Sequence, residues 1–269
     1  MDYDSYASLL DRQVAAGVDF LTVLATTAET PTLSLEEKKK LLAISKEHCG
    51  GLPLLVGCGS NSVAATLENI RQLPGADAYL VVVPFYNKPT QEGMYLYFKA
   101  IAEAAQAPVV IYNVPGRTGA NMLASTALRL AREVPGIIGI KEASGKMDQC
   151  REIIDGAPQG FSVLSGDDDM TFELIKAGGD GVISVASNAL PREVSLMCHL
   201  ALDGRLEQAA ELNARLLPLM KGCFVESNPI PVKAALAELG LCKAGVRIPL
   251  TEATEQTKQT IREILKEWK

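Results

Sequence analysis

The stretches Pro108-Val109-Val110-Ile111-Tyr112 and Ile137-Ile138-Gly139-Ile140-Lys141 are short, mainly β-branched apolar runs that each end in a polar side chain. Runs of this kind, bounded by glycine or proline, are typical of buried strands. Similar runs recur at residues 18–24, 53–58, 78–83, 161–164 and 181–185. The sequence therefore predicts seven strands.

Segments with the period of an α-helix lie between these strands, for example residues 35–47 and 91–105. Ser34 precedes the first of them and Glu37 follows three residues later, which is the pattern of a capping box. Apolar strands that alternate with helices indicate a parallel sheet covered by helices. The first strand is not followed by a glycine-rich nucleotide-binding loop, so a closed barrel is favoured over a doubly wound sheet. The glycine-rich segment at 178–181 precedes its strand, so we interpret that segment as a turn.

After the last strand the pattern becomes purely helical, over residues 191–202, 205–221, 231–239 and 251–266. We predict an α/β fold, a (β/α)8 TIM barrel with a C-terminal helical extension. Residues 1–190 would form the barrel, and residues 191–269 the last barrel helix and a C-terminal helical region of the same structural unit. Such a barrel needs eight strands, yet the chain opens on a helical pattern over residues 3–16, so we expect its first strand to be missing.

Composition excludes several classes of protein. Hydrophobic residues make up 48% of the 269 and charged residues 22%, with a net charge of −6, so a globular protein is expected and nucleic acid or an anionic membrane is a poor partner. Six cysteines without a C-x-x-C pair are typical of reduced thiols, and the acidic start lacks a signal peptide, so we expect a cytoplasmic protein. His48 and His199, far apart, do not form a metal or Ser-His-Asp motif.

In barrels of this type the reactive groups stand at the carboxyl ends of the strands. Lys141 ends a buried apolar run, where desolvation favours the neutral amine and its attack on a carbonyl. The alternative is a lysine whose tip reaches solvent or pairs with Glu142. Tyr112 ends the preceding strand and is a candidate acid/base group or a core residue, and Arg117 in the following turn would suit a carboxylate.

Two further loops carry candidate residues. Thr26 and Thr27 follow the first strand and offer hydroxyls for a carboxylate, or ordinary turn capping. The aromatic loop at residues 84–89, which contains Tyr86, is a candidate lid, interface or packing element.

Several motifs together resemble the dihydrodipicolinate synthase and N-acetylneuraminate lyase family of pyruvate-dependent aldolases. They cover the chain in order: Ala-Thr-Thr-Ala-Glu at 25–29, Pro-Phe-Tyr-Asn-Lys-Pro at 84–89, Tyr-Asn-Val-Pro-Gly-Arg-Thr-Gly at 112–119, Ile-Gly-Ile-Lys-Glu-Ala-Ser-Gly at 138–145, Ser-Gly-Asp-Asp at 165–168 and Gly-Val-Ile-Ser-Val at 181–185. The resemblance implies that Lys141 forms an imine with pyruvate. It also implies a proton relay of Tyr112, Thr26 and Tyr86, the last from a neighbouring subunit.

The same resemblance implies the remaining binding residues. Thr27 would hold the pyruvate carboxylate, the backbone carbonyl of Ile183 would face the site, and Arg117 would bind the carboxylate of L-aspartate 4-semialdehyde. The reaction would yield 4-hydroxy-tetrahydrodipicolinate in lysine and diaminopimelate biosynthesis. It implies no metal and no organic cofactor, and a homotetramer or homodimer.

Alternatives remain open within and outside this family. The chain could be an N-acetylneuraminate lyase or a 2-keto-3-deoxy sugar acid aldolase, although a neutral polyol substrate would not require Arg117. It could also be a non-catalytic barrel crippled by the loss of strand one. Ala25 and Ala28 replace glycines of the family pattern, and a methyl group there is strained only where φ is positive.

The sequence also differs from regulated members of this family at the positions of their lysine feedback site. Positions that resemble the lysine feedback site of regulated synthases carry Leu35, Lys38, Ala65 and Phe85, and only Asn61 matches the sensitive pattern. Without a carboxylate at position 65 an ammonium group loses a partner. We therefore predict weak or absent inhibition by lysine.

Overall fold

The computed structural model describes residues 1–268 and has an α/β fold. It contains two compact units. We call Pro53–Ile183 the strand unit, and Met1–Leu52 together with Ser184–Lys269 the terminal unit.

Parallel strands form the centre of the strand unit. They are β2 (Leu54–Gly57), β3 (Ala78–Val82), β4 (Val109–Asn113), β5 (Ile137–Glu142), β6 (Ser162–Ser165) and β7 (Gly181–Val182). Each is hydrogen-bonded to the next in chain order. A doubly wound sheet would reverse this order at a switch point, so the consecutive order confirms the preference for a barrel-type sheet.

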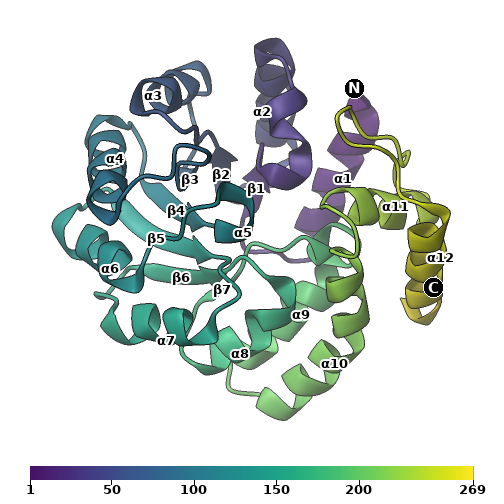
Figure 1. Cartoon of the computed structure of the whole chain (residues 1–269). Helices are drawn as coiled ribbons and strands as arrows, with labels where there is room; N and C mark the ends of the chain where they lie inside the picture. Colours follow the sequence, from purple (N-terminus) through teal and green to yellow (C-terminus); the bar gives the residue numbers. More distant parts are fainter. Residues whose placement is uncertain (269) are drawn as a thin grey trace. The chain divides into compact units, whose positions relative to one another are not determined.

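Helices follow the strands and cover the outside of the sheet (Figure 1). They are α3 (Val63–Gln72), α4 (Gln91–Ala104), α6 (Ala124–Glu133), α7 (Met147–Gly156) and α8 (Thr171–Lys176). Two short helices, α5 (Pro115–Thr118) and the 3-10 turn η3 (Asp168–Met170), lie in the loops after β4 and β6. Packing runs from α3 to α4, α6, α7 and α8 in turn. The predicted turn at 115–119 is in fact one turn of helix, because Pro115 presets its first residue and Gly119, at φ 72°, ends it.

The close approach of β5 to β6 depends on a glycine. A Cβ atom on Gly139 would lie 2.7 Å from the backbone oxygen of Ser162, which is its partner in the strand register. Only a residue without a side chain fits there. This close approach of β5 to β6 lies two residues before Lys141 on the same strand.

The terminal unit is mainly helical. It consists of α1 (Tyr3–Ala15), β1 (Leu21–Val23), η1 (Thr26–Ala28), η2 (Thr30–Thr32), α2 (Leu35–His48), η4 (Ala186–Asn188), α9 (Pro191–Leu202), α10 (Leu206–Gly222), α11 (Ile230–Glu238), α12 (Glu255–Leu265) and η5 (Lys266–Trp268). The predicted capping box is confirmed: the Ser34 hydroxyl accepts from the Glu37 backbone N–H at 3.2 Å, and the Glu37 carboxylate accepts from the Ser34 N–H at 2.9 Å.

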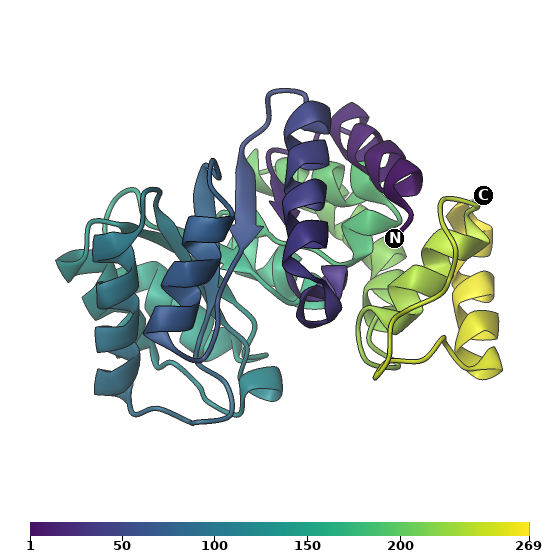
Figure 2. The ribbon, with the colours of Figure 1, turned by 90° about the horizontal axis from the view of Figure 1, so that it is seen from above.

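Polar contacts and a small apolar cluster hold the two ends of the chain within this unit. The Arg12 guanidinium donates to the carbonyls of Asn188 at 3.1 Å and Ala189 at 2.6 Å. Figure 2 shows α12 beside α11 at the C-terminal end. Near them Leu250 packs on Ile230, Ala234 and Ala253.

The strands agree with the sequence-based prediction in number and order, and several are shorter. The described residues contain seven strands, and α1 precedes β1. No helix within residues 1–268 is both long and apolar enough to cross a membrane.

Candidate active site

Lys141 and Tyr112 are neighbours on adjacent strands. They are partners in the register of β4 and β5, so their side chains leave the sheet on the same face. The Lys141 Nζ lies 4.4 Å from the centre of the Tyr112 ring, which is cation–π distance. Both residues are buried, with 6% and 7% of their surface exposed. The structure thus brings together two residues that the sequence separates by a whole helix.

Gly166 makes room for the lysine side chain. A Cβ atom at this position would lie 3.0 Å from Cε and 3.2 Å from Cγ of Lys141, and 2.6 Å from Cβ of Ala143. Since the Gly166 N–H donates to the Glu142 carbonyl at 2.7 Å, the backbone of β6 is fixed against the end of β5. Ala143 therefore excludes a side chain at position 166, and the lysine side chain occupies part of the space that the glycine leaves.

Asp167 is a charged neighbour of Lys141 whose importance the sequence did not reveal. Its carboxylate accepts from the Gly145 backbone N–H at 3.2 Å. Burial, followed by repulsion from Asp169, raises the pKa of Asp167 to about 6, although the Gly145 N–H and the Lys141 charge act in the opposite direction. A partly buried carboxyl group that titrates near neutral pH is characteristic of functional sites.

Arg117 and Tyr86 lie on two loops that touch one another. Arg117 is an exposed residue of α5, and the Tyr86 backbone N–H donates to the carbonyl of Thr118 at 3.3 Å. Tyr86 has φ 73° and is 87% exposed, the adjacent Phe85 being 40% exposed. An aromatic side chain held outward by a left-handed backbone is presented to solvent or to another molecule.

Thr26 and Thr27 belong to η1 in the terminal unit. The Asn228 side-chain amide donates to the Thr27 hydroxyl at 3.0 Å. Glu29 follows with φ 53°, and its carboxylate accepts from the Arg247 backbone N–H at 2.7 Å. These contacts fix the loop after β1 to the C-terminal part of the chain.

The alanines that replace family glycines in this loop are compatible with its backbone. Ala25 has φ −90°, and Ala28 is not among the described non-glycine residues with positive φ. The methyl groups therefore introduce no left-handed strain. Ile183, the last predicted binding residue, is buried, and its N–H donates to the Ser165 carbonyl at 2.9 Å.

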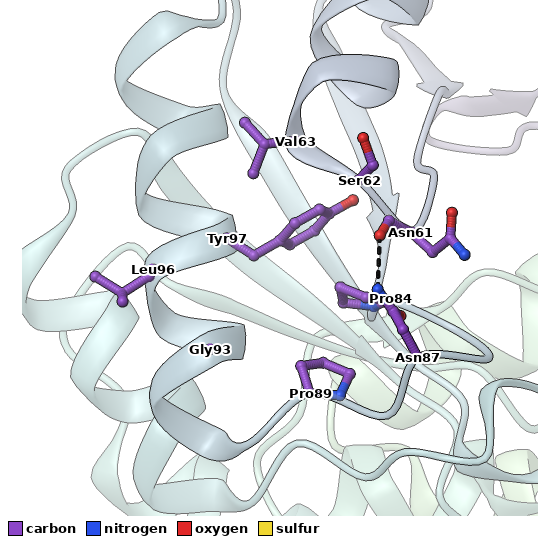
Figure 3. A pocket seen from close by; sticks show the side chains of 9 residues that line it. All are labelled: Asn61, Ser62, Val63, Pro84, Asn87, Pro89, Gly93, Leu96 and Tyr97. Carbon is purple, nitrogen blue, oxygen red and sulfur yellow. Dashed lines mark hydrogen bonds between the residues drawn. The ribbon is translucent and has the colours of Figure 1, made fainter.

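A pocket of about 310 Å³ lies elsewhere on the strand unit, between the start of α3 and α4 (Figure 3). Its lining consists of Asn61, Ser62, Val63, Pro84, Asn87, Pro89, Gly93, Leu96 and Tyr97. The Asn87 amide donates to the Asn61 carbonyl at 3.0 Å, and the Ser62 hydroxyl caps the N–H of Ala65. None of the nine lining residues carries a charge, so an ammonium ligand would find no carboxylate among them.

The fold and this geometry define an α/β protein with a consecutive parallel sheet and a buried lysine at the carboxyl edge of its strands. The chain belongs to the dihydrodipicolinate synthetase family, whose model matches residues 1–268.

Similar proteins support this assignment over the full chain. A 4-hydroxy-tetrahydrodipicolinate synthase of Phocaeicola vulgatus is 49% identical over 272 residues, covering 100% of this chain and 92% of that protein. A monomeric dihydrodipicolinate synthase variant is 46% identical, with a TM-score of 0.97 over 99% of this chain and 91% of that one. The chloride-inhibited dihydrodipicolinate synthase of Acinetobacter baumannii, solved with pyruvate, is 41% identical, with a TM-score of 0.96 over 99% and 92%.

The raised pKa of Asp167 predicts a pH-dependent gain of stability in Asp167→Asn. The raised pKa means that the folded state favours the protonated form of Asp167 more than the unfolded chain does. Its contribution to the free energy of unfolding is therefore fully present below the ordinary pKa of 3.8. That contribution is lost as the pH rises through about 6. Urea unfolding at pH 8 should show the variant more stable by up to about 3 kcal/mol, and near pH 4.5 the two proteins should differ much less. Asp155→Asn, at an exposed aspartate of α7, is the control and should change stability only slightly. An equal change at both pH values would contradict the assignment.

Proposed function

We propose that this chain is a 4-hydroxy-tetrahydrodipicolinate synthase, a lyase of the Schiff-base aldolase type that condenses pyruvate with L-aspartate 4-semialdehyde. The observation that supports this most is the pairing of a buried Lys141 with Tyr112 at adjacent strand ends, in a chain 49% identical to a synthase. The pyruvate bound to the Acinetobacter baumannii relative supports the first substrate. The family alternatives, a sialic acid lyase or a sugar-acid aldolase, have no comparable observation in their favour.

The proposed chemistry begins at the Lys141 amine. Its nitrogen adds to the keto carbon of pyruvate, and loss of water gives an imine. The imine withdraws electrons, so a proton leaves the methyl carbon and an enamine forms, whose carbon then attacks the aldehyde carbon of the second substrate. Tyr112, whose ring centre lies 4.4 Å from the lysine nitrogen, is the group proposed to carry these protons, together with Thr26 and Tyr86. The exposed position of Tyr86 suits a residue that acts in the site of a second copy.

The binding roles follow from the chemistry of the substrates. We assign the pyruvate carboxylate to Thr27, which Asn228 holds in place, and the semialdehyde carboxylate to the exposed Arg117. The Ile183 carbonyl would face the site. No metal or organic cofactor enters this proposal.

We further infer a (β/α)8 barrel architecture, in which residues 1–190 form the barrel body and residues 191–269 its last helix and helical extension. The absence of a first strand remains a prediction. A cytoplasmic homotetramer or homodimer is proposed, although one relative with 46% identity is a monomeric variant.

Reduction with borohydride in the presence of pyruvate tests the lysine. Mass spectrometry should find a pyruvate-derived adduct on the peptide that contains Lys141, and none in Lys141→Ala. Lys146→Ala removes an exposed lysine five positions along and should be trapped like the unmodified protein. A folded unmodified protein without an adduct would exclude the imine mechanism.

Arg117→Ala tests the second substrate. Loss of a charge-assisted contact to carboxylate, of about 1.5–3 kcal/mol, should raise KM for L-aspartate 4-semialdehyde by roughly 10- to 100-fold. Pyruvate trapping should not change, and Arg132→Ala, at an exposed arginine on α6, should behave normally. Efficient turnover of neutral polyhydroxy aldehydes, with no effect of Arg117→Ala, would favour the sugar-acid aldolase instead.

Lysine should inhibit this enzyme weakly or not at all. Ala65 supplies no carboxylate, and the nearby pocket has no charged lining residue, so a bound ammonium group would have no ionic partner there. Steady-state rates should stay unchanged up to millimolar lysine. Clear inhibition at or below millimolar concentration would show that another residue receives the ammonium group.

A further inference from the structure

Behind Lys141 and Tyr112, on the opposite face of the same two strands, lies a closed polar cluster. Asn113 and Glu142 directly follow Tyr112 and Lys141 and are again partners in the register of β4 and β5. Because side chains alternate along a strand, this second pair points away from the first. It is fully buried, with 0% of Asn113 and 2% of Glu142 exposed.

The two residues are bonded to each other and to their surroundings. The Asn113 amide donates to both carboxylate oxygens of Glu142, at 3.2 Å and 2.9 Å. Glu142 also accepts from the Ser144 backbone N–H at 2.7 Å and from the Gln149 amide at 3.0 Å. The side-chain Oδ1 of Asn113 in turn accepts from the Met122 backbone N–H at 3.0 Å. The cluster therefore joins both strand ends to the loop after β5 and to α7.

The charge on Glu142 is unusual for a purely structural link. No lysine, arginine or histidine in the described part of the chain forms an ion pair with this carboxylate. A buried carboxylate is costly even when neutral donors satisfy it, and two apolar or amide side chains would join the strands more cheaply. A carboxylate that accepts four hydrogen bonds does, however, fix the positions of the residues around it more tightly than apolar packing does.

We propose that Asn113 and Glu142 are positioning residues that fix the Lys141 amine against the Tyr112 ring. Each is covalently adjacent to one member of that pair, so the bonds between them set the offset of the two strands where they carry the reacting groups. Through Ser144 the same carboxylate shapes the turn whose Gly145 N–H binds Asp167. This inference rests on the proposed role of Lys141 as the imine-forming residue.

Kinetics on Asn113→Ala test the proposal, because a displacement of about 1 Å between reacting groups is worth roughly 100-fold in rate. We expect kcat and the rate of borohydride trapping with pyruvate to fall about 100-fold, with KM for pyruvate changed by only a few-fold. Asn69→Ala is a matched control: its amide donates to the Cys58 carbonyl at 2.9 Å in the same unit without joining β4 to β5, and it should keep the trapping rate while losing stability.

Glu142→Gln keeps the shape of the side chain and removes its charge, so it stays informative where Asn113→Ala does not fold. Its trapping rate should fall by about tenfold or more. A folded variant of either kind that is trapped at the unmodified rate, or that raises KM with kcat unchanged, would overturn the positioning role. Absence of trapping in the unmodified protein would instead refute the proposed function itself, so the two failures are distinguishable.

Discussion

The candidate site depends on the register between β4 and β5. Pairing of Tyr112 with Lys141, and of Asn113 with Glu142, determines which side chains share a face. A shift of one residue in either strand would pair the lysine with an apolar residue or with an amide, and would place a charged group in the core. The backbone bonds of the ladder are local and non-specific, so the choice among registers of β4 and β5 falls to the buried polar pair, Asn113 and Glu142.

A buried lysine is tolerated here because its surroundings replace part of the solvation that it loses. The Lys141 nitrogen lies 4.4 Å from the centre of the Tyr112 ring, and its charge acts to lower the pKa of the nearby Asp167 carboxyl. Gly166 leaves the space in which the side chain extends.

The sequence predicted the seven strands and the buried position of Lys141, because both follow from local patterns. Apolar runs bounded by glycine or proline identified every strand, and Ser34 with Glu37 identified the start of α2. That Tyr112 and Lys141 lie on neighbouring strands follows from a barrel, whereas the register that pairs them follows from no local pattern. Asp167 and Gly166 were seen only as part of a motif, because their effects on Lys141 arise from distances between β5 and β6 that no local pattern contains. The one-turn helix at Pro115 was too short to produce a helical period.

Three ionisable side chains lie close together at the ends of β5 and β6, and neutral amide and backbone N–H groups donate hydrogen bonds to the two carboxylates among them. Lys141, Glu142 and Asp167 are each wholly or partly buried, and a direct ion pair between lysine and either carboxylate would hold the proton on nitrogen and suppress nucleophilic attack. Glu142 is turned to the opposite face and satisfied by amides and backbone N–H groups, and Asp167 is bound by Gly145. Both carboxylates therefore find hydrogen-bond donors other than the Lys141 amine, which suits the imine chemistry proposed for that lysine. Stability is given up for this arrangement, as is common where reactive groups are buried.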